Sequence, residues 1–109
     1  MIVMKFGGTS VGSAERIRKK AEIVKSYLAK KPVVVVSAVT KITDSLIKLS
    51  NESVKGKGDN IFKSIKSTHT AILRGLGINE NLLKNDFEAI AALMKSAKTA
   101  GNLNARMMD

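Results

Sequence analysis

The sequence contains no cysteine and no tryptophan, and only one proline and one histidine among 109 residues. Without cysteine there is neither a disulfide framework nor a thiolate metal site, and one histidine cannot make a metal cluster. No apolar run approaches the ~20 residues of a membrane-spanning helix. The amino terminus also lacks the basic and apolar regions of a secretion signal. We therefore expect a soluble protein of the cytoplasm that does not act on membranes.

Acidic residues are scarce, because nine Asp and Glu stand against 19 Lys and Arg, for a formal net charge of +10. A small basic protein can be a nucleic-acid-binding module that neutralises phosphates. The densest basic set comprises Arg16, Arg18, Lys19, Lys20, Lys25, Lys30 and Lys31. Nucleic-acid readers usually interleave aromatics with such residues, whereas this segment has only Tyr27. We favour a solvated helix face and keep a basic non-catalytic nucleic-acid-binding module as the alternative from another functional class.

The first 37 residues have the pattern of a βαβ unit. Residues 1–6 form a short apolar run that predicts a buried strand, and Pro32 introduces a second strand over 33–37. Between them, Ser13 is a good helix N-cap, and the helix is predicted to end at Lys30. Its apolar stripe consists of Ile17, Ala21, Val24 and Leu28. A right-handed crossover would make the strands parallel, so that both end at one edge of the sheet, where ligands bind in open α/β sheets.

The rest of the chain has helical patterns. A short helix carrying apolar residues at 46, 47 and 49 can be capped by Thr40 or Thr43, and residues 55–58 have the composition of an exposed loop.

Two longer helical stripes follow. The first is stopped by Gly75 and Gly77, and the second is capped by Asn79. Their members are Ile61, Ile65, His69, Ile72 and Leu76, and then Leu83, Phe87, Ile90, Met94 and Ala97. Residues 60–98 are therefore predicted to form a helical hairpin, with His69 as a partly buried structural residue.

Residues at the carboxyl ends of the two expected strands indicate phosphate chemistry. Gly7 and Gly8 follow the first strand, and a glycine pair lets the backbone N–H groups approach an anion closely. A helix that starts near Ser13 would present its positive end to the same place. Lys5 adds a mobile full charge. The Walker A loop does not fit, because no lysine follows its second glycine position, and the dinucleotide fingerprint fails at Thr9.

The segment 5–11, followed by residues 33–38 and then by 42–44, closely resembles the start of aspartate kinases in the amino acid kinase family. The resemblance is strong over residues 1–50. It implies an α/β fold: a three-layer α/β/α sandwich of the carbamate kinase-like type with parallel strands, followed here by a helical hairpin.

The resemblance also implies a domain organisation. Residues 1–109 would be the amino-terminal part of one amino acid kinase catalytic domain, with a βαβ unit at 1–50 and a helical segment at 51–109. The remainder of the kinase and any regulatory domain would be absent.

Site residues can be carried over by position. Lys5, Phe6, Gly7 and Gly8 match the segment of the family that binds nucleotide phosphates, and Lys5 would also be catalytic. No metal-ligating residue is identified.

Ser37 and Thr43 match the loop that binds the amino acid substrate, with Thr43 at the position of the threonine that contacts aspartate. Capping of the following turn and helix is the structural alternative for these hydroxyls. The family often has glycine just before the Ile-Thr pair, where this sequence has Lys41.

The implied reaction is ATP-dependent phosphorylation of the L-aspartate side-chain carboxylate to 4-phospho-L-aspartate, with Mg2+ on the nucleotide. This is the first step of lysine, threonine and methionine biosynthesis. The 109 residues alone are expected to be inactive, and the full-length enzyme is expected to be a homo-oligomer. The alternative within the fold is another amino acid kinase, such as a glutamate 5-kinase or a uridylate kinase-like enzyme.

Overall fold

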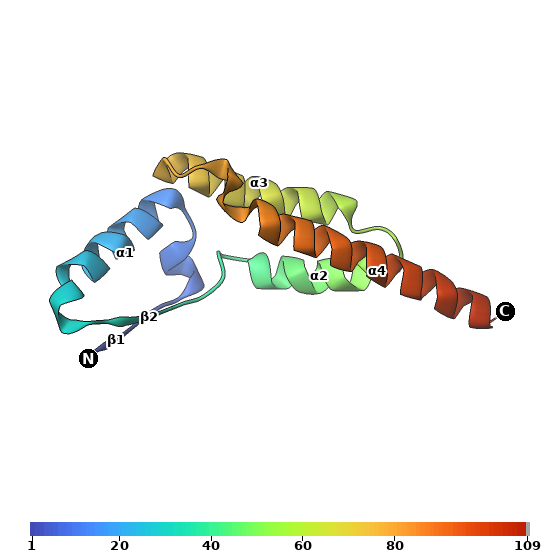
Figure 1. The fold of residues 1–109 in the computed structure, drawn as a ribbon, viewed down its shortest axis with the longest axis horizontal. Helices are drawn as coiled ribbons and strands as arrows, with labels where there is room; N and C mark the ends of the chain where they lie inside the picture. The colour runs from blue at the N-terminus through green and yellow to red at the C-terminus, as the bar shows by residue number, and fades with distance from the viewer. Residues whose placement is uncertain (109) are drawn as a thin grey trace.

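The amino-terminal third of the chain forms the predicted βαβ unit in the computed structural model (Figure 1). The structure describes residues 1–108, and all of their side chains except those of Thr9, Ser10 and residues 102–108. Asp109, the last residue of the predicted helical segment 51–109, lies outside this description. Strands β1 (Val3–Phe6) and β2 (Val33–Val36) pair in parallel, with Val3 opposite Val33 and Phe6 opposite Val36. Helix α1 (Ala14–Ser26) connects them. The predicted α/β fold class with parallel strands is confirmed.

Helix α1 begins where the sequence predicts and ends earlier. The Ser13 hydroxyl oxygen accepts a hydrogen bond from the Arg16 backbone N–H at 3.2 Å, which caps the first turn. The helix ends at Ser26, whose hydroxyl donates to the Ile23 carbonyl at 2.6 Å, and a 3-10 turn, η2 (Leu28–Lys30), follows. The predicted end at Lys30 is therefore the end of η2.

Strand β1 is much more exposed than predicted, and β2 is exposed as well. The four valines of β2 are between 41% and 60% exposed, and in β1 only Met4 and Phe6 are half-buried. Helix α1 has no buried residue. Its predicted apolar stripe contains half-buried Ile17 and Val24 and exposed Ala21 and Leu28. Two strands and one crossover helix can enclose little apolar surface. The local sequence patterns therefore predict the element types correctly but predict more burial than the structure has.

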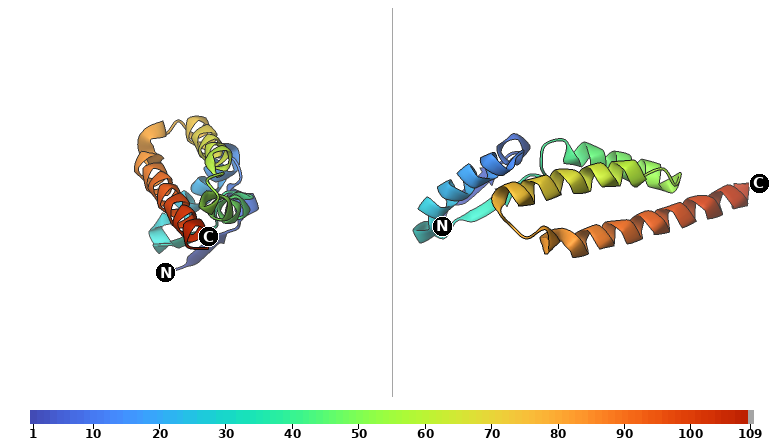
Figure 2. Two further views of the ribbon diagram at one scale, coloured as in Figure 1. Left: turned by 90° about the vertical axis from the view of Figure 1, so that its right-hand side faces the viewer. Right: turned by 90° about the horizontal axis from the view of Figure 1, so that it is seen from above.

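Three helices form the rest of the described chain and extend along the long axis of the molecule (Figures 1 and 2). They are α2 (Ile42–Val54), α3 (Asp59–Leu76) and α4 (Lys84–Met108), with a 3-10 turn, η3 (Glu80–Leu83), before α4. Helix α2 packs against both α3 and α4. The predicted helical hairpin is confirmed, although α4 continues beyond residue 98 to Met108.

The turn between α3 and α4 uses two of the predicted signals. Gly77 ends α3 in the left-handed conformation, with φ at 70°, while Gly75 lies inside the last turn of the helix. Asn79 caps η3 rather than α4, because its side-chain oxygen accepts from the Asn81 N–H at 2.8 Å. Arg74 forms an exposed ion pair with Glu80, and its hydrogen bond lowers the pKa of the Glu80 carboxyl.

A small apolar core lies between the three long helices. Ile42 and Leu49 of α2 and Ile65 of α3 are 7%, 4% and 3% exposed. Half-buried side chains surround them: Val39, Ile61, Phe62, Ile90 and Met94. The radius of gyration is 17.7 Å, against about 13 Å for a compact chain of this length. Such an elongated shape can bury only a small core.

His69 has the structural role predicted for it. Its Nδ1 atom lies 2.7 Å from the Ile65 carbonyl oxygen. Its ring meets Phe87 of α4 edge to face, with 6.2 Å between the centroids, and Phe87 meets Phe62 in the same manner at 6.3 Å.

None of the helices within residues 1–108 is long and apolar enough to cross a membrane.

A close contact joins the βαβ unit to the helical half. The Arg18 guanidinium donates to the Gly75 carbonyl at 2.5 Å. A Cβ atom at position 75 would lie only 2.6 Å from the Ala14 Cβ. The first turn of α1 therefore lies directly against the last turn of α3, which requires glycine at position 75.

The core makes a testable prediction. Ile65→Ala should lower the free energy of unfolding by about 2–5 kcal/mol, because it leaves a cavity among α2, α3 and α4. Ile47→Ala is the matched control, since Ile47 is 58% exposed, and it should change that free energy by less than about 0.5 kcal/mol. Urea unfolding monitored by circular dichroism measures both. Equal losses would show that the core is not where the structure has it.

Candidate functional site

The parallel pairing brings the ends of both strands to one edge of the sheet. Lys5 lies opposite Val35 and Phe6 opposite Val36, and the Ser37 N–H donates to the Phe6 carbonyl at 3.0 Å. Beyond this point β1 continues into Gly7 and a 3-10 turn, η1 (Gly8–Val11), and β2 continues into residues 37–41. We call these segments, residues 7–13 and 37–41, the glycine loop and the second loop.

A side-chain hydrogen bond ties the two loops together. The Thr40 hydroxyl donates to the Gly8 carbonyl at 2.8 Å. A Cβ atom at Gly8 would lie 3.2 Å from the Ala38 carbonyl oxygen, and one at Gly12 only 2.5 Å from Thr40 Oγ1. Neither glycine has a positive φ. A side chain at Gly12 would clash with Thr40, and one at Gly8 would crowd Ala38. The close approach of the second loop, not backbone conformation, therefore favours glycine at both positions.

Gly7 differs from the other glycines of its loop. Its φ is not positive, and a Cβ atom built on it would meet nothing within 4 Å. Nothing in the described structure prevents a side chain at this position. The backbone next to the carboxyl end of β1 is thus open to solvent, and a ligand can approach it closely there.

Lys5 and Phe6 lie on opposite faces of β1. Lys5 is exposed and forms no ion pair with the residues that the structure describes, so its ammonium is available to a ligand. Phe6 is half-buried, and its carbonyl is used by Ser37. A lysine next to two apolar residues suggests burial, which would require a charged partner; the exposed position of Lys5 removes that requirement.

The second loop leads into α2 in a way that the sequence does not reveal. The expectation that Thr40 or Thr43 caps α2 is wrong: Lys41 occupies the N-cap position with φ at 67°, and no side chain caps the helix. The Thr40 hydroxyl is instead bonded to Gly8, and Thr43 lies exposed in the first turn. Ser37 is also exposed, with its hydroxyl oxygen 3.6 Å from a Cβ built at Gly8.

The loops therefore bring Phe6, Gly8 and Ser37 together. Lys5, Gly7 and Thr43 are exposed, and no hydrogen bond joins Thr43 to the glycine loop among the described residues. Sequence reasoning missed the roles of Thr40 and Gly12. The spacing of Gly7 and Gly12 drew attention to position 12 as a possible Walker glycine, but a contact with Thr40 cannot be read from local spacing.

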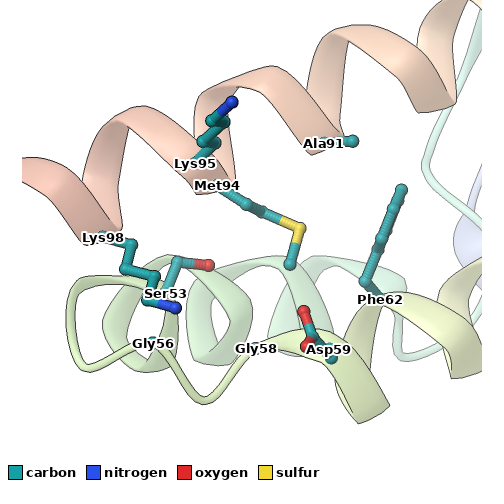
Figure 3. Close-up of a pocket in the computed structure, with 9 residues that line it drawn as sticks. All are labelled: Ser53, Gly56, Gly58, Asp59, Phe62, Ala91, Met94, Lys95 and Lys98. Carbon is teal, nitrogen blue, oxygen red and sulfur yellow. The ribbon is translucent and has the colours of Figure 1, made fainter.

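A separate groove of about 310 Å³ lies between α4 and the turn that joins α2 to α3 (Figure 3). It is lined by Ser53, Gly56, Gly58, Asp59, Phe62, Ala91, Met94, Lys95 and Lys98. Figure 3 shows Met94 reaching from α4 into this groove toward Asp59. None of the predicted site residues lines it. We place the candidate site at the loops, where exposed hydroxyls, a cation and open backbone occur together.

The described residues do not provide a metal site of their own. No group of three or more His, Asp or Glu side chains suited to a metal ion occurs within residues 1–108.

Comparison with known proteins agrees with this arrangement. The model of the amino acid kinase family matches residues 1–107. "Aspartokinase 2, chloroplastic" of Arabidopsis thaliana is 32% identical over 98% of this chain and 21% of its own length. The "Aspartokinase" of Chlamydia trachomatis is 41% identical over 74% of this chain and 18% of its own, and that of Rickettsia prowazekii is 48% identical over 48% and 12%.

The chain thus spans about a fifth of the length of the plant relative that it matches almost throughout. The family match covers the glycine loop, the second loop and nearly all of the helical half. The chain belongs to the amino acid kinase family, and within it resembles the amino-terminal portion of aspartokinases.

Proposed function

We propose that this segment contributes to an ATP-dependent aspartate kinase, which transfers the γ-phosphoryl group of ATP to the side-chain carboxylate of L-aspartate. The main observation in support of the proposal is that the two loops lie at one edge of the sheet and are joined by the Thr40–Gly8 hydrogen bond. One loop offers open backbone next to a lysine, and the other offers hydroxyls. A reaction between an anionic nucleotide and an amino acid needs both kinds of group within one site.

The chemistry asks for positioning and charge neutralisation. A carboxylate oxygen of aspartate attacks the γ-phosphorus, a new P–O bond forms, and the bond to the departing ADP oxygen breaks. The acceptor carboxylate is ionised at neutral pH and needs no general base. The protein's task is to align the two substrates and to stabilise the negative charge of the transferring group.

The proposed roles follow the positions of the residues. Lys5 would neutralise charge on the phosphates, and Gly7 and Gly8 would let the backbone approach them. Phe6 would hold this segment at the end of β1, since its side chain is half-buried and its carbonyl is bonded to Ser37.

Ser37 and Thr43 would bind the amino acid. Both are exposed, one at the start of the second loop and one in the first turn of α2. A hydroxyl can donate a hydrogen bond to a carboxylate, and such bonds to a charged group are stronger than neutral ones.

The wider assignment rests on the family relationship. We propose that residues 1–109 form the amino-terminal part of one catalytic domain that uses ATP with Mg2+ and assembles as a homo-oligomer when complete. We also propose a cytoplasmic location, which does not follow from the family relationship, because the plant relative is named as chloroplastic. The step would lead to lysine, threonine and methionine. The described residues include neither a metal-binding carboxylate group nor a completed sheet, so these residues alone should be inactive.

Lys5→Ala tests the catalytic assignment in the complete polypeptide that contains this sequence. Removal of a charge directed at the transferring phosphoryl group should lower kcat by roughly a hundredfold or more. Lys25→Ala, on the exposed last turn of α1, is the control and should leave kcat unchanged. ADP release with aspartate present is the measurement, and near-normal turnover of the Lys5 variant would contradict the assignment.

Gly7→Ala separates ligand approach from folding. The structure has open space at this Cβ, so the free energy of unfolding should stay the same or rise by up to about 1 kcal/mol. The KM for ATP should nevertheless rise, because a methyl group would block the backbone from the phosphates. Thermal unfolding and steady-state kinetics together decide; a variant with unchanged KM for ATP would exclude close phosphate contact at Gly7.

Thr43→Val removes one hydroxyl at nearly constant volume. Loss of a hydrogen bond to a charged substrate should cost about 1.5–3 kcal/mol, which raises the KM for aspartate by about tenfold to a hundredfold and leaves the KM for ATP nearly unchanged. Thr99→Val on α4 is a control, because the Thr99 hydroxyl donates to the Lys95 carbonyl within its own helix. Equal changes in both Michaelis constants for the Thr43 variant would identify a purely structural residue.

A further inference from the structure

Lys41 has a rare backbone conformation at the end of the second loop, next to Thr40. Its φ and ψ are 67° and 0°, in the left-handed region that favours glycine. Residues held in such conformations cluster at functional sites, where the surrounding structure maintains them. Within residues 1–108 the other non-glycine residue with positive φ is Lys31, at 51°, which lies at the opposite end of β2.

The neighbours of Lys41 impose this conformation. On one side, Thr40 is held by its hydrogen bond to the Gly8 carbonyl. On the other, Ile42 is only 7% exposed in the core, and its N–H donates to the Val39 carbonyl at 2.9 Å. The Lys41 carbonyl itself accepts from the Ser45 N–H at 3.2 Å and so starts α2. With both flanks fixed, Lys41 must make the sharp turn between them.

The side chain of Lys41 is available for a ligand. Lys41 is exposed and forms no ion pair with the part of the chain that the structure describes. It lies in sequence directly between Thr40, which touches the glycine loop, and the turn that carries Thr43. A lysine ammonium on a flexible four-carbon stem can reach an anion bound between the glycine loop and the first turn of α2.

We propose that Lys41 is a substrate-binding residue, whose ammonium contacts a carboxylate of the amino acid acceptor. This inference rests on the proposed function and adds a charged determinant of acceptor binding to it. The acceptor is favoured over the nucleotide because Lys41 is the N-cap of the helical turn that carries Thr43, while Lys5 in β1 already supplies a cation next to the glycine loop. Glycine would fit the backbone of Lys41 without strain but would bring no charge.

Matched substitutions separate the charge from the backbone. Asparagine tolerates the left-handed conformation better than lysine does, so Lys41→Asn removes the charge without straining the turn. Lys31→Asn makes the same change at the other left-handed lysine, away from the site. Lys41→Arg keeps the charge. All three are made in the complete polypeptide that contains this sequence, with kcat, the KM values for aspartate and ATP, and the melting temperature as readouts.

Lys41→Asn should raise the KM for aspartate by about tenfold, the lower end of the range for a hydrogen bond to a charged group, because the lysine is exposed. The KM for ATP should stay unchanged, and Lys41→Arg should restore most of the aspartate affinity. Lys31→Asn should leave both Michaelis constants as they are. The two asparagine variants should have melting temperatures equal to or slightly above that of the unsubstituted protein.

Other outcomes would contradict this inference or the proposed function. If the unsubstituted protein turns over with aspartate but Lys41→Asn has a normal KM for aspartate, or only its KM for ATP rises, this inference is wrong and the proposed function stands. If Lys31→Asn raises the KM for aspartate equally, the effect comes from the backbone, and the inference is again wrong. If the unsubstituted protein shows no aspartate-dependent ADP release, the proposed function fails and this inference fails with it.

Discussion

The parallel pairing of β1 with β2 is the constraint on which the site depends. Backbone hydrogen bonds fix the register from Val3 opposite Val33 to Phe6 opposite Val36. Because the strands run in the same direction, the loops that follow them begin at the same edge of the sheet. Residues more than thirty positions apart in sequence thereby become neighbours. A one-residue slip would move every side chain of β1 to the other face. Lys5 would then exchange faces with Phe6, and the exposed cation would be lost from its present position.

The loops that follow this sheet are arranged by small residues. Gly12 lets Thr40 approach within a distance that a side chain would prevent, and Gly8 leaves Ala38 room that a side chain would crowd. The Thr40–Gly8 hydrogen bond then holds the loops together. Among the glycines of the glycine loop, Gly7 differs in having open space beside it. The glycines therefore have two separate uses, one for contact between loops and one for access by a ligand, although they look equivalent in the sequence.

Much of this arrangement could be predicted from the sequence, because local chemistry determines it. Ser13 caps α1 as expected, and Pro32 with the four valines marks β2. The failures concern contacts between distant residues. Thr40 has the residue type and position of a helix cap, but its hydroxyl is used by a carbonyl 32 positions earlier. The apolar sequence of β1 predicts more burial than the strand has, because exposure depends on how many elements cover a strand, which no local pattern records.

The contact between Ala14 and Gly75 has a consequence for how this part of the family can vary. The first turn of α1 follows the glycine loop directly, and the Arg18 bond to the Gly75 carbonyl holds it against α3. A larger side chain at position 75 would push on Ala14 and so on the loop itself. A bulkier residue at one of these two positions therefore requires a small residue at the other, or a shift of α1 away from α3.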